Sequence, residues 1–495
     1  MNWIESKNSE TFSIKDMPVL KIDELTSQLI KSVKDGKRLI QFFGVEDAGK
    51  IILHAVTADD NLSKIYTASS LLDPGSSYDS LTPSVPSAFL FEREFYEQFG
   101  IKPEGHPWLK PVRKGIRGID KEEIPYEFFK MSGEEVHEVG VGPVHAGIIE
   151  PGHFRFSCHG EIVHHLEIEL GFQHRGIEHL FIKNSHRPLY MLKLAESIAG
   201  DTMIGHAGTF ARCIESLSDA AVSKRAKFIR TIMLELERIG NHLGDLSALS
   251  NDVAYLTGNA AFGALRTKVI NTSMMICGSR FGRSLIAYGG VNFDITPEQK
   301  VKIVSAINLL KDEVSLAAEV LFTSASVMER FEKTGIIETE TAAEIGMVGP
   351  AGRASGLSLD IRSDHPFEAF EYFPFHKLTL RSGDVFARAY IRFIEVQQSI
   401  KIINELIENL PEGELNKNIP GLKEDSLVIS MTEGWRGEIS HVILTDNTGK
   451  IKRVTVKDPS FNNWFGLALA VRNEGISDFP LCNKSFNLSY CGFDL

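Results

Sequence analysis

Histidines are the first residues in this sequence whose type and clustering suggest chemistry. Ten of the sixteen lie between His137 and His206, and imidazole is the side chain that most often binds metal ions. Their spacing does not fit a mononuclear zinc enzyme. His164 and His165 would point to opposite faces of a strand, and no H-E-x-x-H run is present. We therefore interpret most of these histidines as surface residues or hydrogen-bonded core residues.

The cysteines do not form a recognisable site either. They are odd in number and no two are spaced as C-x-x-C, so neither a disulfide framework nor a zinc finger is indicated. A reducing cytosol fits this usage best. The five are Cys158, Cys213, Cys277, Cys482 and Cys491.

The whole-chain numbers describe an ordinary globular protein. With 495 residues, 43% hydrophobic and 24% charged, the chain has room for two to four domains, and we expect two. The formal charge of -12 argues against nucleic acid as a partner. No apolar run approaches the roughly 18 to 20 residues needed to cross a bilayer, and the first residues lack an export pattern. We expect a chain that is not itself transmembrane.

The first part of the sequence predicts a small α/β domain over residues 1–118. Helical spacing, strand-like runs and turn residues alternate there, and a charged stretch at 120–123 follows, which indicates a linker over residues 119–135. We predict helices at 23–34 and 88–99, strands at 38–43 and 50–57, and a turn between these strands at 44–49.

The rest, residues 136–495, predicts a mainly helical bundle with β-hairpins, which makes the fold class α+β. Residues 224–250 carry an apolar stripe beside a polar seam of Arg238, His242, Asp245 and Asp252. Such a helix suits a bundle with polar groups near its centre. Further helices are predicted at 297–333 and 383–410, and hairpins at 154–170 and 433–456, the last turning at 446–449.

Several longer runs occur in an order that resembles two subunits of bacterial complex I. Residues 91–101 and 105–109 are similar to the C subunit. Downstream runs are similar to the D subunit and to its relatives, the large subunits of energy-converting nickel–iron hydrogenases of the formate-hydrogenlyase type. The resemblance covers about residue 88 to the end and implies a C/D fusion with a hydrogenase large-subunit-like fold. The downstream runs are 142–145, 150–156, 174–178, 235–243, 289–291, 353–356 with Asp360 and Arg362, 436–438 and 462–464.

The hydrogenase relatives bind nickel and iron through two C-x-x-C pairs, because these metals prefer soft thiolates. The resemblance puts the first pair at Ala199 and Thr202 and the second at Ser489 and Gly492, with Cys491 out of register by one residue. The four expected ligand positions have therefore lost their sulfur. We expect no nickel and no hydrogen turnover.

The resemblance to the D subunit raises quinone reduction as an alternative. Asp252 matches the aspartate that D subunits place near the quinone headgroup. The matching histidine position falls on Pro151, two residues from His153, and the tyrosine position falls on Gly200. The histidine that D subunits hold beside the terminal iron–sulfur cluster falls on Arg283. An acid and a nearby histidine still suffice to deliver protons.

Glu178, His153 and Asp252 are the candidate proton-transfer or quinone-pocket residues. The resemblance gives Glu178 a proton-transfer role, which needs a tuned carboxyl, and a structural ion pair with Arg175 is its equal alternative. For Asp252 we favour function, because a carboxylate ending a buried polar seam needs a partner or a proton path. Arg353 and Arg362 are expected to be charged residues pairing with Asp360 or an interface.

The resemblance implies a peripheral-arm subunit of a membrane-associated respiratory or hydrogenase-4-like oxidoreductase complex. Expected partners are an iron–sulfur small subunit, which would carry a 4Fe–4S cluster, and integral membrane antiporter-like subunits. This chain would bind no cofactor unless it helps to form a quinone pocket, and it would not be active alone. We expect it on the cytoplasmic, inner face of the cell membrane. The alternative is a catalytically empty subunit that couples redox change to those membrane partners. A stand-alone enzyme is the weakest hypothesis, because no nucleotide-phosphate loop for NAD or ATP is present.

Overall fold

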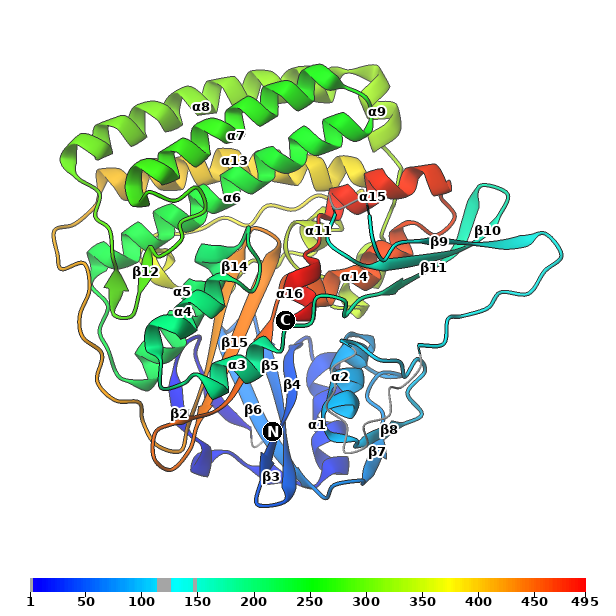
Figure 1. Ribbon diagram of the computed structural model, residues 1–495, viewed down its shortest axis with the longest axis vertical. Helices are drawn as coiled ribbons and strands as arrows, with labels where there is room; N and C mark the ends of the chain where they lie inside the picture. The colour runs from blue at the N-terminus through cyan, green and yellow to red at the C-terminus, as the bar shows by residue number, and fades with distance from the viewer. Residues whose placement is uncertain (1–2, 114–125, 146–148) are drawn as a thin grey trace.

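The structure is a computed structural model that describes residues 3–113, 126–145 and 149–495. Its class is α+β, as predicted. Long helices are stacked at one end of the molecule, and two mainly antiparallel sheets lie at the other (Figure 1). The predicted domain boundary at residue 118 and the charged stretch at 120–123 lie outside the described residues.

The N-terminal part is a twisted sheet with a helix on its face. Its strands run in the order β1-β6-β5-β4, with β3 parallel to β6, and α1 buries Leu25 and Leu29 toward the sheet core. The smaller strands β7 and β8 pair beside α2. The bounds are β1 Ile4–Ser6, β3 Val19–Leu20, α1 Ile22–Lys34, β4 Arg38–Asp47, β5 Lys50–Asp59, β6 Lys64–Leu72, β7 Ser77–Asp79, α2 Phe89–Phe99 and β8 Lys102–Glu104.

The turn between β4 and β5 lies within the predicted range 44–49 but is shorter, because β4 continues to Asp47 and the chain reverses at Ala48 and Gly49, both with positive φ. Gly44 lies inside the strand for a packing reason. A Cβ at this position would collide with the rings of Phe95 and Phe99 on α2. The glycine therefore permits close helix–sheet packing and does not mark a turn.

The second sheet combines residues from both ends of the chain. Its order is β16-β15-β14-β2, so strand β2, Thr11–Ser13, pairs with the much later strand β14, Ser426–Gly434. The predicted hairpin with its turn at 446–449 is confirmed as β15, Gly437–Thr445, and β16, Ile451–Lys457. The start of that prediction, 433–434, belongs instead to the end of β14.

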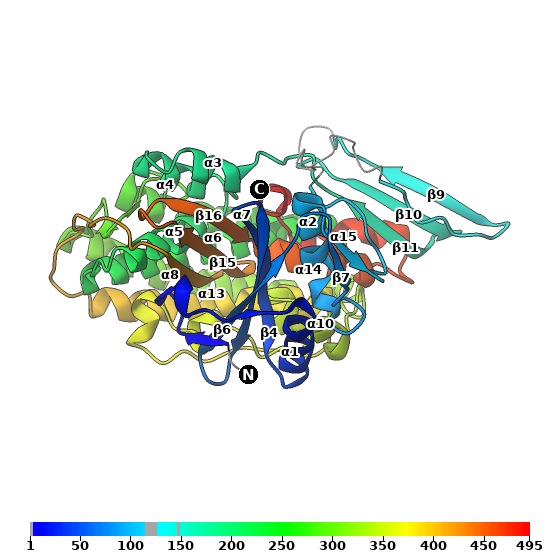
Figure 2. The ribbon, with the colours of Figure 1, turned by 90° about the horizontal axis from the view of Figure 1, so that it is seen from below.

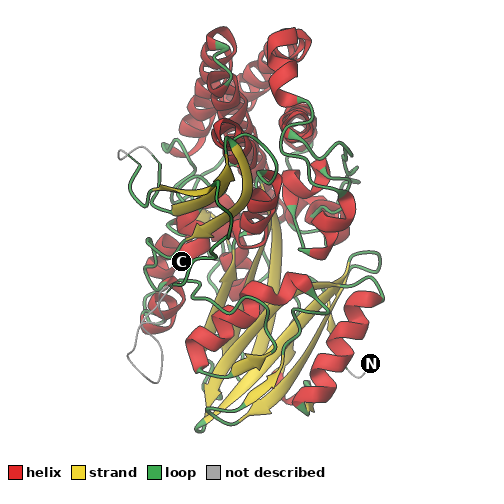
Figure 3. Cartoon of the chain, turned by 90° about the vertical axis from the view of Figure 1, so that its right-hand side faces the viewer, coloured by secondary structure: helices red, strands yellow, loops and turns green. Residues whose placement is uncertain are grey.

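Long helices form the bundle at the top of Figures 1 and 3, and α6 packs against both α7 and α13. The apolar stripe of α6 is buried, as predicted. The single helix predicted over 297–333 is wrong, because Ser324 has an extended backbone and separates α8 from α9. The bounds are α5 Met203–Leu217, α6 Lys224–Asp252, α7 Leu256–Cys277, α8 Pro297–Thr323, α9 Ala325–Phe331 and α13 Val385–Glu408.

A three-stranded antiparallel sheet projects from the bundle (Figure 2). It contains the predicted hairpin of β10, His153–His159, and β11, Ile162–Glu169, and adds β9, Val136–Val141. No helix within the described residues is both long enough and apolar enough to span a bilayer. The remaining elements are α3 Ile177–Lys183, α4 Pro188–Glu196, β12 Ile286–Ala287, β13 Gly290–Val291, α10 Thr339–Glu344, α11 Gly349–Ala354, α12 Ile361–Asp364, α14 Pro459–Ala470, α15 Phe479–Phe486 and α16 Tyr490–Asp494.

Candidate functional site

The two segments that carry the expected ligand positions lie together, although they are almost 300 residues apart in the sequence. Arg175 joins them. Its Nη2 donates to the carbonyl of Ile198 at 2.9 Å and to that of Cys491 at 2.9 Å, and its Nη1 donates to Ser197 O at 2.6 Å. We call the region between residues 197–202 and 487–492 the lost-ligand site.

An ion pair and an indole occupy the inner side of this site. Arg436, in the turn between β14 and β15, binds both carboxylate oxygens of Asp201, at 2.6 and 2.8 Å, and donates from Nε to Asn487 O at 2.5 Å. Trp435 Nε1 donates to Thr202 Oγ1 at 3.1 Å. Burial acts to raise the pKa of Asp201, but the charge of Arg436 outweighs it and holds the pKa below its usual value.

The donors at the four positions do not fit a nickel–iron group. Ala199 offers a methyl group, and Thr202 and Ser489 offer hydroxyls, which are hard, weak donors beside the thiolates that these metals require. Ser489 Oγ already accepts the backbone N–H of Gly492, at 2.9 Å, and so caps α16. A Cβ at Gly492 would meet the carboxylate of Asp458 at 2.7 Å.

Glu178 is buried in a structural ion pair, but not with the predicted partner. It pairs with Arg453 at 3.1 Å, whereas the guanidinium of Arg175 binds the carbonyls described above. Oε1 of Glu178 also accepts from Thr455 Oγ1 and Val456 N, each at 2.9 Å. The side chain lines a cavity of about 30 Å³ that it shares with Glu94 of α2, which is room for a water molecule.

His153 and Asp252 lie away from Glu178, and none of the hydrogen bonds or ion pairs seen among the described residues joins any two of the three. His153 is half-buried on β10, with Nδ1 3.2 Å from Gly142 O. Asp252 is the last residue of α6 and is exposed, so its expected place in a buried seam is wrong. Desolvation by neighbouring groups still raises the pKa of its carboxyl to about 6, with Lys484 opposing.

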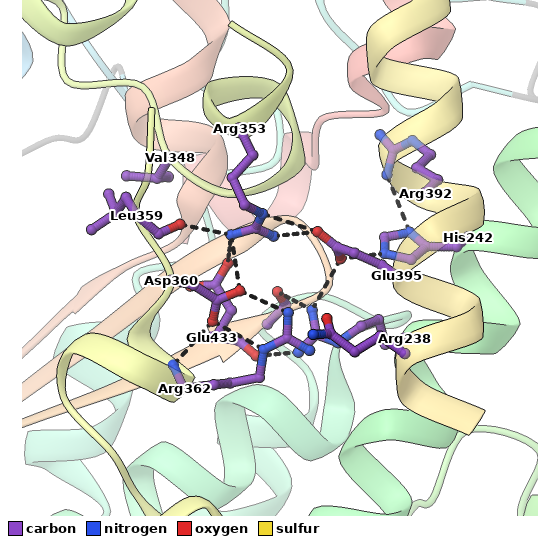
Figure 4. Close-up of polar contacts among 12 residues, drawn as sticks. Arg238, His242, Val348, Arg353, Leu359, Asp360, Arg362, Arg392, Glu395 and Glu433 are labelled. Carbon is purple, nitrogen blue, oxygen red and sulfur yellow. Dashed lines mark hydrogen bonds and ion pairs between the residues drawn. The ribbon is translucent and has the colours of Figure 1, made fainter. Parts of the chain in front are cut away.

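The rest of the polar seam on α6 is buried as predicted and enters a cluster of charges (Figure 4). Arg353 is its hub. Nε and Nη2 donate to Glu395 Oε1 of α13 at 3.0 and 2.7 Å, and Nη1 donates to Glu433 Oε1 of β14 at 2.7 Å. The same Nη1 lies 3.4 Å from Asp360 Oδ2, so the predicted pairing of Arg353 with Asp360 is confirmed.

Arg362 closes the cluster on the other side. It binds Asp360 through Nε and Nη2, at 3.0 and 2.7 Å, as predicted, and reaches Glu235 of α6 at 3.3 Å. Glu235 also pairs with Arg238 at 3.2 Å. We call this cluster the inner network. Its members are Glu235, Arg238, His242, Arg353, Asp360, Arg362, Glu395 and Glu433, and none is more than 1% exposed.

Comparison with known proteins gives the family. Residues 21–114 match the family described as respiratory-chain NADH dehydrogenase, 30 Kd subunit, and residues 252–425 match its 49 Kd subunit. The C/D subunit of the NADH-quinone oxidoreductase of Phocaeicola vulgatus is 31% identical over 384 residues, which cover 70% of this chain and 73% of that protein. The chain belongs to the C/D family of complex I subunits.

Hydrogenase subunits are also similar to this C/D-family chain. Formate hydrogenlyase subunit 5 of Escherichia coli (strain K12) is 27% identical over 434 residues, covering 83% of this chain and 76% of that protein. A chain in the structure of the membrane-bound sulfane sulfur reductase, described as an archaeal respiratory membrane complex, superposes with a TM-score of 0.67. It is 24% identical and covers 73% of this chain and 99% of that one, so this likeness concerns the fold. The resemblance read from the sequence is confirmed.

Sequence reasoning about the C/D-family chain missed Glu395 and Glu433 of the inner network and a buried histidine pair. His206 Nε2 lies 3.0 Å from Asp458 Oδ2, and His206 Nδ1 lies 3.1 Å from His441 Nε2. Burial holds the pKa of His441 well below its usual value. His206 belongs to the histidine-rich stretch, but only the fold brings Asp458 and His441 to it.

Proposed function

We propose that this chain is a peripheral-arm subunit of a membrane-associated respiratory or hydrogenase-4-like oxidoreductase complex, in which it contacts an iron–sulfur small subunit and holds no nickel–iron centre. Two observations support this. The chain belongs to a family of respiratory oxidoreductase subunits, and the lost-ligand site offers no sulfur donor at its four expected positions.

The lost-ligand site carries the proposal. Cys491 is the one thiol in its second segment, and it lies one residue from the nearer expected position, Gly492. Burial raises the pKa of its thiol to about 12, and one thiol does not replace the two C-x-x-C pairs that nickel and iron require. The ion pair of Arg436 with Asp201 occupies the inner side of the site.

Metal analysis of the intact complex, purified from its native membrane, tests this proposal. We expect far less than one nickel per chain, and no hydrogen oxidation with a dye acceptor, beside a nickel-containing hydrogenase measured in parallel. One nickel per chain would overturn the proposal.

Protease accessibility in inverted vesicles tests the cytoplasmic face. Co-purification with a cluster-bearing small subunit and antiporter-like membrane proteins tests the assembly, and isolation of the chain without them would contradict it.

Asp252 favours quinone chemistry as a second candidate function over a purely structural, coupling subunit. An exposed carboxyl whose pKa is raised to about 6 transfers a proton readily near neutral pH. Asp252→Asn should lower soluble-quinone turnover by the intact complex at least tenfold. The control is Asp312→Asn, another acid outside the site and on α8. Equal turnover in both variants would remove Asp252 from the mechanism and favour the coupling role.

A further inference from the structure

The inner network contains an uneven number of charges. Three guanidiniums, from Arg238, Arg353 and Arg362, face the carboxylates of Glu235, Asp360, Glu395 and Glu433. If every carboxylate is ionised and His242 is neutral, the cluster carries one net negative charge with no solvent contact. An uncompensated charge buried in this way is expensive, and uptake of one proton removes it.

His242 does not hold that proton. Arg392 Nη1 lies 3.3 Å from His242 Nδ1, and a guanidinium can only donate, so Nδ1 must be the acceptor. Nε2 then carries the hydrogen and donates it to Glu395 Oε2 at 2.9 Å. A second proton on the ring would face the guanidinium. Desolvation and this neighbour hold the pKa of His242 down to about 4.

Arg392 is itself accounted for outside the network. It pairs with Asp245 at 3.0 Å and donates to the carbonyls of Ser485 and Phe486 at 2.8 and 3.0 Å. Lys484, which is partly exposed, lies 3.7 Å from the same Asp245. Arg392 therefore compensates Asp245, which is only 2% exposed, and the remaining charge of Lys484 is in contact with solvent.

Glu433 and Asp360 are the two carboxylates that compete for one donor. Both approach Nη1 of Arg353, at 2.7 and 3.4 Å. Asp360 has a second, bidentate partner in Arg362, whereas the other contact of Glu433 is the backbone N–H of Ile361 at 3.1 Å. Two like charges sharing a buried site favour one proton between them.

We propose that the Glu433–Asp360 pair is a proton-binding site that holds one exchangeable proton in the core of this subunit, chiefly on Glu433. Burial and the charge of Asp360 raise the pKa of Glu433 to about 7. Arg362 and Arg353 outweigh burial at Asp360 and hold its pKa below its usual value. The proton is therefore gained and lost near neutral pH, and Asp360 stays ionised.

The other charged groups around the pair are compensated locally. On β15, Glu438 lies opposite Glu433 but pairs with Lys457 and Arg38. Asp364 accepts from the backbone of Asp360 and pairs with Lys377. On the opposite face of β14, Arg212 of α5 contacts Ser430, Met431 O and Thr432.

The position of the pair links it to the lost-ligand site. Glu433 lies three residues before Arg436, whose guanidinium binds Asp201, and Arg238 holds the carbonyls of Glu433 and Gly434 at 2.7 and 2.9 Å. The two sites are joined by the short end of strand β14. A change of charge at the lost-ligand site should therefore shift the pKa of Glu433. This proton site does not depend on the proposed function, because it rests on the charges of the chain alone.

Infrared difference spectroscopy of the purified full chain between pH 6 and pH 8 tests the proposal. A buried protonated carboxyl has a carbonyl band apart from those of ionised carboxylates and of the backbone. We expect a band that falls with a midpoint near pH 7 and is missing in Glu433→Gln, the variant that mimics the protonated form. Glu237→Gln is the matched control, because it also replaces a buried carboxyl but lies outside the inner network. This variant should keep the band with its midpoint near pH 7.

A second measurement covers the case in which Glu433→Gln does not fold. Carbon-13 labelling of glutamate in the Glu237→Gln chain shifts the band of Glu433 without a contribution from Glu237, whose pKa is raised to about 8, and leaves the bands of Asp252 and Asp494 in place. We expect a shifted band with a midpoint near pH 7. Its absence, or its persistence in a folded Glu433→Gln chain, would overturn the proposal.

Discussion

The inner network and the lost-ligand site are built from the same part of the chain, yet they are held together differently. In the inner network each guanidinium has more than one acidic or carbonyl partner, and all eight side chains are sealed from water. In the lost-ligand site the guanidiniums of Arg175 and Arg436 bind mainly backbone carbonyls, and the one ion pair seen there among the described residues includes Asp201, whose side chain is 36% exposed. We therefore expect the inner network to contribute more to the stability of the fold than the lost-ligand site does.

The sharpest way to break this comparison is to remove the hub of the inner network. Arg353→Met leaves Glu395, Glu433 and Asp360 without their shared cation, so we expect the free energy of unfolding to fall by about 3–5 kcal/mol, because buried charges lose their partner. Urea denaturation measures it. Lys268→Met, in the exposed pair with Glu313, is the control and should cost no more than about 1 kcal/mol. Similar losses in both variants would mean that the network is no support.

The next largest effect is expected in the pH dependence of the free energy of unfolding, through Glu237 beside the lost-ligand site. Glu237 is buried and accepts from Ile204 N and Gly205 N at 2.7 and 3.2 Å, and burial raises its pKa from its usual value of 4.5 to about 8. The folded pKa lies above the unfolded one, so the stability due to the neutral form is complete below pH 4.5 and is lost as the pH rises through 8.

Glu237→Gln should therefore be less sensitive to pH than the wild type. Each unit of pH in this window corresponds to at most about 1.4 kcal/mol, so we expect the wild type to lose about 2 kcal/mol more than the variant between pH 5.5 and pH 7.5. Urea denaturation at both values measures the difference. Parallel losses in the two proteins would show that Glu237 is already ionised at neutral pH.

Sequence periodicity predicted the side of α6 on which charges lie, but not what those charges contact. The spacing of Arg238, His242 and Asp245 is a local property of the helix, so these residues share one side of α6 in the structure. Glu395 and Glu433 are 42 and 80 residues from Arg353, and no local pattern links such positions. Asp252 shares the seam's spacing, but α6 ends there and the residue faces water.

The same limit explains the other outcomes. The pairing of β2 with β14 joins residues more than 400 positions apart in the sequence. No local pattern near Thr11 or Ser13 predicts it. The lost-ligand positions are a prediction that the resemblance supplied. Arg436 and Asp201 fill the space between those positions, and their pairing is a property of the fold.

A smaller effect measures how tightly the lost-ligand site has closed. Gly492→Ala places a Cβ at 2.7 Å from Asp458, so we expect a loss of about 1–3 kcal/mol through overpacking. Gly200→Ala, where a Cβ meets nothing within 4 Å, is the matched control in the other segment and should change stability by at most about 0.5 kcal/mol. Equal midpoints of urea denaturation would show that α16 moves to make room, and that the site is looser than its contacts indicate.

The smallest effect on stability is expected at Asp252, which belongs to neither the inner network nor the lost-ligand site and is a candidate for chemistry. The side chain is exposed and its neighbour Lys484 is directed mainly at Asp245 and Asn487, so Asp252→Asn should change the free energy of unfolding by less than about 0.5 kcal/mol. The test compares urea midpoints of the two purified chains at pH 7. A loss comparable with that of Arg353→Met would place Asp252 in the support of the fold. A chain of unchanged stability that turns over quinone more slowly in the complex would instead assign the carboxylate to chemistry, because nothing in the fold then depends on it.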